Sequence, residues 1–219
     1  MNDTKALDLA AMMCSRLCHD MLSPIGALSN GLELLTDETD PQMREKCLEL
    51  LEQSAKISAD KLKFFRLAFG AAGGFGEMVP VEEPKALVDA LASNNARITL
   101  NWALAEQKLP KTAVKVLLNF AQIAIDSLVR GGVLDIGAET RDGASEIVVR
   151  ASGEKVVFDD NIGKALDGTL AADDITSRTA AAHMLSLLAE AQGGTLQYKH
   201  SSDALVLGAV IPQPEGLIG

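Results

Sequence analysis

Residues 15–25 read SRLCHDMLSPI, and they lie within a longer run of apolar or small side chains spaced three and four residues apart. That run consists of Leu7, Ala10, Cys14, Leu17, Met21, Ile25, Leu28, Leu32 and Leu35. Such spacing places the side chains on one face of a helix, so it predicts one amphipathic helix over residues 6–35. Pro24 inside the pattern removes a backbone donor and clashes with the carbonyl group of residue 20, which costs about 3 kcal/mol and indicates a kink.

A second helix is predicted directly after the first. Residues 36–40 (TDETD) interrupt the first pattern, and Asp40 followed by Pro41 is typical of an N-cap with proline at the first helical position. The helix should run from there to about Phe69, with two adjacent apolar stripes. One stripe holds Met43, Cys47, Leu50, Ser54 and Ile57, and the other holds Leu48, Leu51, Ala55, Leu62, Phe65 and Phe69.

The short connection makes the two helices antiparallel neighbours. Two helices cannot cover apolar faces this broad, whereas two hairpins related by a twofold axis can. We therefore expect a homodimer held together by a four-helix bundle.

The rest of the chain predicts a second domain. Residues 70–76 (GAAGGFG) are typical of a hinge, so we divide the chain into domains over 1–70 and 77–219. The patterns beyond the hinge predict helices over 84–93, 112–129 and 175–192, and strands over 98–104, 133–138, 146–151, 156–158, 195–199 and 204–211. This order favours an α/β sandwich with helices on one face of a mixed sheet, and an α+β class for the whole chain.

Composition excludes several functional classes. The 219 residues are 47% hydrophobic and 23% charged, which is typical of a globular protein, and the net charge is −10. Without a run of Lys and Arg, binding to nucleic acid through phosphates is not expected. The first residues carry no signal pattern and no apolar run reaches the ~20 residues of a membrane span, so we expect a cytoplasmic protein with no membrane partner.

The three cysteines give no metal-binding pattern. Cys14 and Cys18 lie one helical turn apart, but no second Cys/His pair has a suitable spacing. We expect these two and Cys47 to be buried free thiols, and we expect no metal site.

His19 is the first candidate for chemistry. It follows Leu17 by two residues and precedes Met21 by two, and two residues turn a helix through about 200°, so His19 should point away from the core. Asp20 comes directly after it. On these residues alone, a bent core helix with an idle surface histidine explains the pattern as well as a functional site does.

Residues 15–25 resemble the H-box of sensor histidine kinases. That box is a histidine, an acidic residue, three further residues and a proline, on the first helix of a dimeric hairpin. The resemblance implies that His19 is the phospho-acceptor and that Asp20 orients its ring and raises its nucleophilicity. Ser23 stands where many such kinases carry a Thr or Asn that orients a water molecule for phosphatase chemistry.

The residue type suits this chemistry. A neutral imidazole has a free nitrogen lone pair near pH 7, and a neighbouring carboxylate can determine which nitrogen carries it. Phosphoryl transfer depends mainly on in-line positioning and on neutralisation of charge by a metal, which a partner protein can supply.

The second half resembles the ATP-binding (Bergerat) domain of the same kinases over nearly all of residues 80–212, but its nucleotide boxes are degenerate. Asn119 is kept, whereas Ile123 stands where the family has the asparagine that holds Mg²⁺. Residues 151–155 (ASGEK) lack the adenine-binding Asp and the last glycine of that box. Residues 179–181 (TAA) replace a Gly-x-Gly loop, so the backbone has no glycine for a close approach to a triphosphate.

An H-box hairpin joined to a degenerate ATPase-like domain resembles the ChpT family of alphaproteobacterial phosphotransferases across essentially the whole chain. The resemblance implies a dimer that accepts a phosphoryl group from the receiver domain of a hybrid kinase. It passes the group to response regulators of the cell cycle, without a cofactor of its own and with Mg²⁺ supplied by the receiver. We expect the receiver to contact the face of His19, which carries Met12, Ser15, Arg16, Leu22, Ser23 and Gly26.

Three other functions remain open at this point. An active ATP-dependent kinase would need a ligand for Mg²⁺ that Ile123 cannot provide. A dimeric adaptor would bind receivers without phosphorylation of His19. A response-regulator phosphatase would act through Asp20 and Ser23, and it is compatible with phosphotransfer. The two remaining histidines, His183 and His200, are expected to be structural or solvated.

Overall fold

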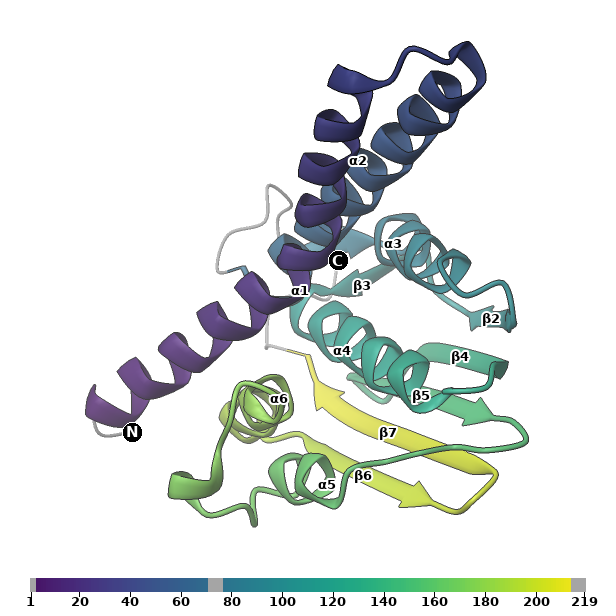
Figure 1. Ribbon diagram of the computed structural model, residues 1–219. Coiled ribbons are helices and arrows are strands. Elements are labelled where there is room, and N and C mark those ends of the chain that lie inside the picture. The colour runs from purple at the N-terminus through teal and green to yellow at the C-terminus, as the bar shows by residue number, and fades with distance from the viewer. Residues whose placement is uncertain (1–2, 71–76, 214–219) are drawn as a thin grey trace.

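The computed structural model describes residues 3–70 and 77–213, in which a long helical hairpin projects from a sheet domain (Figure 1). The hairpin consists of α1 (Asp3–Asp37) and α2 (Pro41–Phe69). Both predicted helices are therefore confirmed, and α1 bends partway along its length (Figure 1). Pro24 lies inside α1 and accounts for such a bend.

The turn of the hairpin is closed by local hydrogen bonds. The carboxylate of Asp40 accepts from the backbone N–H of Gln42 at 3.1 Å, and Pro41 occupies the first helical position, as the sequence predicts. Arg44 donates to the carbonyl groups of Leu35 and Glu38 at 2.9 and 2.8 Å. These bonds satisfy carbonyl groups at the end of α1 and hold the two helices antiparallel.

The sheet domain has a mixed five-stranded sheet with strand order β2-β4-β5-β7-β6. Its strands are β2 (Ile98–Leu104), β4 (Gly132–Arg141), β5 (Ala144–Ser152), β6 (Thr195–His200) and β7 (Ala204–Pro212). Only β2 and β4 pair in parallel; the other three pairings are antiparallel. A separate antiparallel pair joins β1 (Met78–Pro80) and β3 (Lys108–Pro110).

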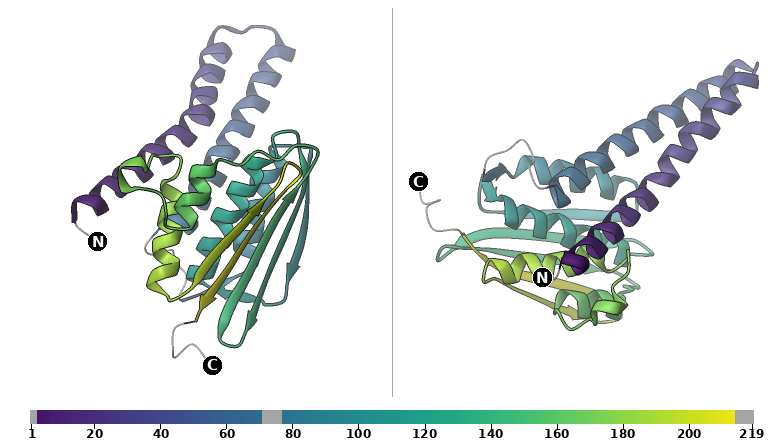
Figure 2. Two further views of the ribbon diagram at one scale, coloured as in Figure 1. Left: turned by 90° about the horizontal axis from the view of Figure 1, so that it is seen from below. Right: turned by 90° about the vertical axis from the view of Figure 1, so that its left-hand side faces the viewer.

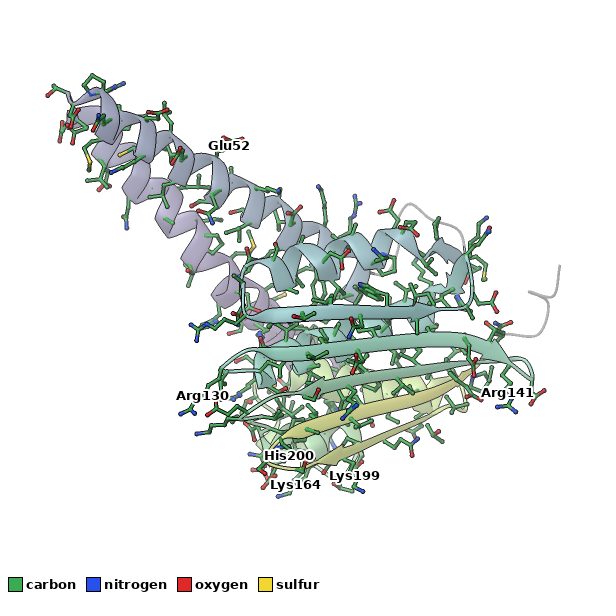
Figure 3. The ribbon with its side chains drawn as sticks, turned by 90° about the vertical axis from the view of Figure 1, so that its right-hand side faces the viewer. Glu52, Arg130, Arg141, Lys164, Lys199 and His200 are labelled. Carbon is green, nitrogen blue, oxygen red and sulfur yellow. The ribbon has the colours of Figure 1, made fainter. Side chains whose placement is uncertain are left out.

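The helices of this domain cover one face of the sheet (Figure 2). They are α3 (Glu82–Ser93), α4 (Lys111–Ser127), α5 (Asp160–Leu166), a short 3₁₀ turn (Ala172–Asp174) and α6 (Ala180–Ala191). Figure 3 shows the opposite face of the sheet, which no described helix covers, with Arg130 and Arg141 at its two ends. The α+β class and the layered sandwich are as expected from the sequence.

The hairpin and the sheet domain share one hydrophobic core. Phe64 and Leu67, near the end of α2, are buried in the same cluster as Val88 of α3 and Leu117 of α4. Residues 71–76 of the proposed hinge (70–76) and the last residues of the 77–219 domain (214–219) lie outside the described residues. The division into domains stays a prediction, but the last turns of α2 pack into the second domain.

Two predicted elements beyond the hairpin are wrong. Residues 156–158 are not a strand, because Val156 donates to Ser202 and Val157 to Ser127, two separate segments rather than one neighbouring strand. The last long helix begins at Ala180 instead of residue 175. The Thr179 hydroxyl accepts from the N–H of Thr176 at 2.9 Å and stabilises a turn that competes with the helix. The sequence reading also missed β1, β3 and α5.

The expectation of buried thiols holds for Cys47 and is wrong for Cys14 and Cys18, which are exposed in this single chain. Both belong to α1, whose apolar face is broader than α2 alone can cover. Among the helices of residues 3–70 and 77–213, none combines the length and apolar character needed to cross a bilayer.

Candidate functional site

His19 lies on α1 with 83% of its side chain exposed, on the side turned away from the core, as the helical spacing predicts. Its Nδ1 is 3.2 Å from Oδ1 of Asp20. When Nδ1 carries the proton and donates to this carboxylate, Nε2 keeps its lone pair and faces solvent. The geometry therefore presents a nucleophilic nitrogen to an incoming molecule.

The carboxylate of Asp20 is held from a second side by Arg16, whose Nε donates to Oδ2 at 2.7 Å. The same guanidinium group lies 3.6 Å from the carboxylate of Asp126 on α4. Gln122, one turn earlier on α4, donates to the other oxygen of Asp126 at 2.8 Å. A chain of polar contacts thus connects the sheet domain, through Arg16, to the residue next to His19.

Asp126 has a perturbed acidity. Loss of hydration raises the pKa of its carboxyl group, and the neighbouring Arg16 opposes that shift. The side chain of Asp126 is 55% exposed, so its hydration is reduced rather than removed.

The residues that were expected to share the face of His19 fall into two groups, one that is accessible beside His19 and one that faces the sheet domain. Ser15, Leu22 and Ser23 are exposed, and nothing lies within 4 Å of the position that a Cβ of Gly26 would take. Leu22 exposes 69% of its surface on this face.

Two members of that set turn toward the sheet domain instead. Arg16 is half-buried and points at α4. Met12 lines a hollow between the beginning of α1 and α6, together with Leu187. Contact with a partner through Met12 would therefore compete with packing inside the chain.

A second hollow, of about 440 Å³, lies beside the H-box between the hairpin and the helices α3 and α4. We call it the interdomain hollow. Its polar lining consists of Arg16, Asp20, Ser23, Ser54, Lys61, Asn94, Asn95, Gln122 and Asp126. Sequence reasoning missed Lys61 and Asp126, because each comes from an element whose packing against α1 is not encoded in its own pattern.

One residue in each of the three segments that resemble nucleotide boxes forms a side-chain hydrogen bond within the chain. The side chain of Asn119 is buried and donates back to the carbonyl group of Lys115 at 2.8 Å. Glu154, in the second box, accepts from Arg130 at 2.8 Å. Thr179, in the third, is buried and hydrogen-bonded within its own turn.

A small hollow lies beside Asn119 and Ala181. It measures about 70 Å³ and is lined by Asn119 and Ile123 of α4 together with aromatic rings of both domains. The rings are those of Phe64, Phe65, Phe69 and Phe158. Sites for small molecules usually measure about 300–1,000 Å³.

Within residues 3–70 and 77–213, no three His, Cys, Asp or Glu side chains gather in a way that would hold a metal ion. The chemistry that the described residues offer is that of an exposed imidazole with a fixed carboxylate beside it. Such a group can accept a phosphoryl group when another molecule brings both the group and the cation.

Comparisons with known proteins find similar proteins over most of the chain. Residues 81–204 fit the sequence model of a family described as histidine phosphotransferase C-terminal domain. The chain is 31% identical to the protein phosphotransferase ChpT of Brucella abortus (strain 2308), over 93% of this chain and 96% of that protein. It also matches the solved structure of a bacterial phosphotransferase with a TM-score of 0.80 and 31% identity, over 93% of this chain and 96% of that one.

Histidine kinases are also found, at lower similarity. The kinase AdeS of Acinetobacter baumannii matches over 90% of this chain and 98% of its own, with a TM-score of 0.49 and 15% identity.

Proposed function

Because this chain belongs to the ChpT-type histidine phosphotransferases, we propose that His19 is the residue that carries the phosphoryl group. The donor is the receiver domain of a hybrid kinase, and the acceptors are response regulators of the cell cycle. The observation that carries this proposal is the geometry of His19: 83% exposed, on a helix, with a carboxylate oxygen 3.2 Å from Nδ1.

The transfer is a direct exchange of one bond for another. Nε2 of His19 attacks the phosphorus atom of an aspartyl phosphate on the donor, the P–O bond breaks, and the aspartate leaves as a carboxylate. The reverse step delivers the group to an aspartate of the acceptor. Asp20 stabilises the positive charge that develops on the ring, and the receiver's own Mg²⁺ neutralises the phosphoryl oxygens.

The protein acts as a dimer in this proposal. The hairpin leaves an exposed apolar stripe on each helix, with Ile25 and Leu32 on α1 and Leu48 and Leu62 on α2. Ile25 and Leu32 are seven positions apart and Leu48 and Leu62 are fourteen, which is one and two heptads, so each pair lies along one face of its helix. A patch of this kind is unfavourable in water, and a second hairpin would cover it in a four-helix bundle.

The protein does not use ATP in this proposal. A space of about 70 Å³ beside Asn119 and Ile123 is far smaller than a nucleotide requires. Ile123 offers no oxygen for Mg²⁺. The phosphoryl group must therefore come from another protein.

The receiver contacts the surface around His19 in this proposal. Ser15, Leu22, Ser23 and Gly26 leave the ring accessible, and the exposed side chain of Leu22 offers apolar area that the receiver can bury. Arg16 borders the same surface, although its charge is already engaged with Asp20 and Asp126.

The test is to supply labelled phosphate from two sources. Wild type, His19→Gln and the control His200→Gln are incubated with labelled ATP alone and with a labelled, phosphorylated receiver domain. We expect acid-labile label from the receiver only, in wild type and His200→Gln but not in His19→Gln.

Each other outcome selects a different function. Label taken directly from ATP would show a kinase and overturn the argument from the small cavity. A receiver that binds but transfers nothing would identify an adaptor. Release of inorganic phosphate from the receiver without labelled protein, lost in Ser23→Ala, would identify a phosphatase.

A further inference from the structure

The bend in α1 leaves one backbone carbonyl group without its helical partner. In an α-helix the carbonyl oxygen of residue 20 accepts from the N–H of residue 24, and residue 24 of this chain is proline, which has no N–H. An unpaired carbonyl group in a half-buried position is unfavourable, commonly by about 1–3 kcal/mol. The affected carbonyl belongs to Asp20, directly after His19.

Lys61 of α2 provides the missing donor. Its Nζ lies 2.8 Å from the carbonyl oxygen of Asp20, across the hairpin and 41 residues away in sequence. The lysine is half-buried, and the bond therefore has little competition from water. A positive donor also makes this hydrogen bond stronger than the neutral one it replaces.

Asp20 is consequently held through both its main chain and its side chain. Lys61 holds its main-chain carbonyl at 2.8 Å, and Arg16 holds its carboxylate at 2.7 Å. The carboxylate in turn contacts Nδ1 of His19. The orientation of the imidazole ring therefore depends on a turn of α1 in which the carbonyl group of Asp20 has no N–H donor from its own helix.

We propose that Lys61 is a positioning residue for phosphoryl transfer: by donating to the carbonyl group that Pro24 leaves unpaired, it holds the turn of α1 that carries His19 and Asp20. This inference rests on the proposed function of His19. Lys61 does not touch the reacting atoms. It determines the orientation of the residues that do, and small displacements of reacting groups reduce transfer rates strongly.

The test restores a hydrogen-bond donor for the carbonyl group of Asp20 without Lys61. Pro24→Ala gives residue 24 an N–H that reaches the same carbonyl, so Lys61 is then no longer needed. The transfer rate from a phosphorylated receiver is measured at saturating and subsaturating receiver for wild type, Lys61→Met, Pro24→Ala and the double variant. Lys63→Met is the matched control, because Lys63 is an exposed lysine on the same helix whose Nζ lies 3.6 Å from the carboxylate of Asp60.

We expect Lys61→Met to lower the rate at saturation by about tenfold or more, with little change in the half-saturating concentration of receiver. Lys61→Arg, which keeps a cationic donor, should retain most of the rate, and Lys63→Met should match wild type. In the Pro24→Ala background, loss of Lys61 should change the rate by less than about twofold, since the carbonyl group already has its donor. Melting curves recorded in parallel confirm that each variant is folded at the assay temperature.

The results separate this inference from the function it rests on. If wild type accepts label but Lys61→Met is equally fast, or if Lys61 matters as much in the Pro24→Ala background, the inference is overturned and the proposed function stands. A change confined to the half-saturating concentration would also overturn it, because that would show a contact with the receiver. If wild type accepts no label, the proposed function fails and the inference fails with it.

Discussion

His19 illustrates how much of a reactive site is made by neighbours. The imidazole is exposed, and among the described residues its side-chain partner is Asp20, at 3.2 Å. Asp20 is in turn held by Arg16 at 2.7 Å. The nucleophile is free to meet a partner, while the group that orients it is fixed.

Replacement of Asp20 tests this arrangement. We expect Asp20→Asn to slow formation of phosphohistidine by about tenfold or more, since an amide can present an N–H to the ring and does not stabilise the imidazolium charge. Single-turnover transfer from a phosphorylated receiver measures this directly. Asp37→Asn, an exposed position at the end of the same helix, should leave the rate unchanged, and equal rates for both variants would contradict the role given to Asp20.

The burial of His183 predicts how the free energy of unfolding depends on pH. Burial lowers the pKa of this histidine, whose Nδ1 has no hydrogen-bond partner among the described residues, and the described charged residues lining the same hollow are Lys5, Asp8 and Asp173. The unfolded chain takes up a proton at this histidine as the pH falls through about 6.5, before the folded chain does. The free energy of unfolding should therefore decrease below that pH.

Urea denaturation at pH 7.5 and 5.5 tests the sign. Wild type should lose more stability between the two values than His183→Leu, in which this group no longer titrates while all others do. Parallel losses in the two proteins would show that the acidity of His183 is not altered by folding.

At the scale of the elements, the hairpin has two kinds of apolar surface. One faces inward, where Gly31 lets the helices approach so closely that a Cβ there would lie 2.9 Å from Leu51. The other faces solvent and includes Leu32 and Leu48, which are 57% and 55% exposed. The inward surface closes the hairpin, and the outward one is available to a second hairpin.

If the outward surface is the dimer interface, a charged side chain placed on it should weaken the dimer. Leu32→Glu should raise the dissociation constant of the proposed dimer by at least about tenfold, because a buried unpaired carboxylate costs more than 1.4 kcal/mol. Sedimentation equilibrium measures it. Leu34→Glu is the control: this leucine is equally exposed but lies about 200° away around the helix. A monomeric wild type, or equal effects of both substitutions, would contradict the dimer interface.

At the scale of the whole molecule, the end of α2 is part of the sheet domain's core. Phe64 is fully buried there and packs edge-on against Phe65 with ring centroids 5.9 Å apart. The same rings line the small hollow beside Asn119 and Ile123. The aromatic side chains thus close the small cavity and join the hairpin to the sheet domain.

Truncation of one ring should therefore affect both parts together. Phe64→Ala should lower the free energy of unfolding by about 3–5 kcal/mol. Urea denaturation followed by Trp102 fluorescence, for the sheet domain, and by circular dichroism, for the helices, should show one shifted transition by both probes. Phe158→Ala is the comparison variant, because Phe158 lines the other side of the cavity and belongs to the sheet domain alone. Separate transitions in wild type would show that the two parts do not share a core.

Much of the architecture is local information, and the sequence alone was sufficient for it. The periodic spacing of apolar residues predicted both helices of the hairpin, Asp40 and Pro41 predicted where the second begins, and the spacing around His19 predicted its exposure. These features depend on residues within a few turns of one another. The H-box and the missing glycine at residues 179–181 are likewise properties of short segments.

Only the tertiary structure decided what depends on distant partners. Residues 156–158 have the composition of a strand, but their hydrogen bonds go to two separate segments. Lys61 reaches Asp20 from 41 positions away, and Arg16 meets Asp126 of another domain. The sequence implied that Pro24 leaves a carbonyl group unpaired, yet the donor that pairs it is determined by how the chain packs, because a hydrogen bond across a hairpin requires geometry that no local pattern contains.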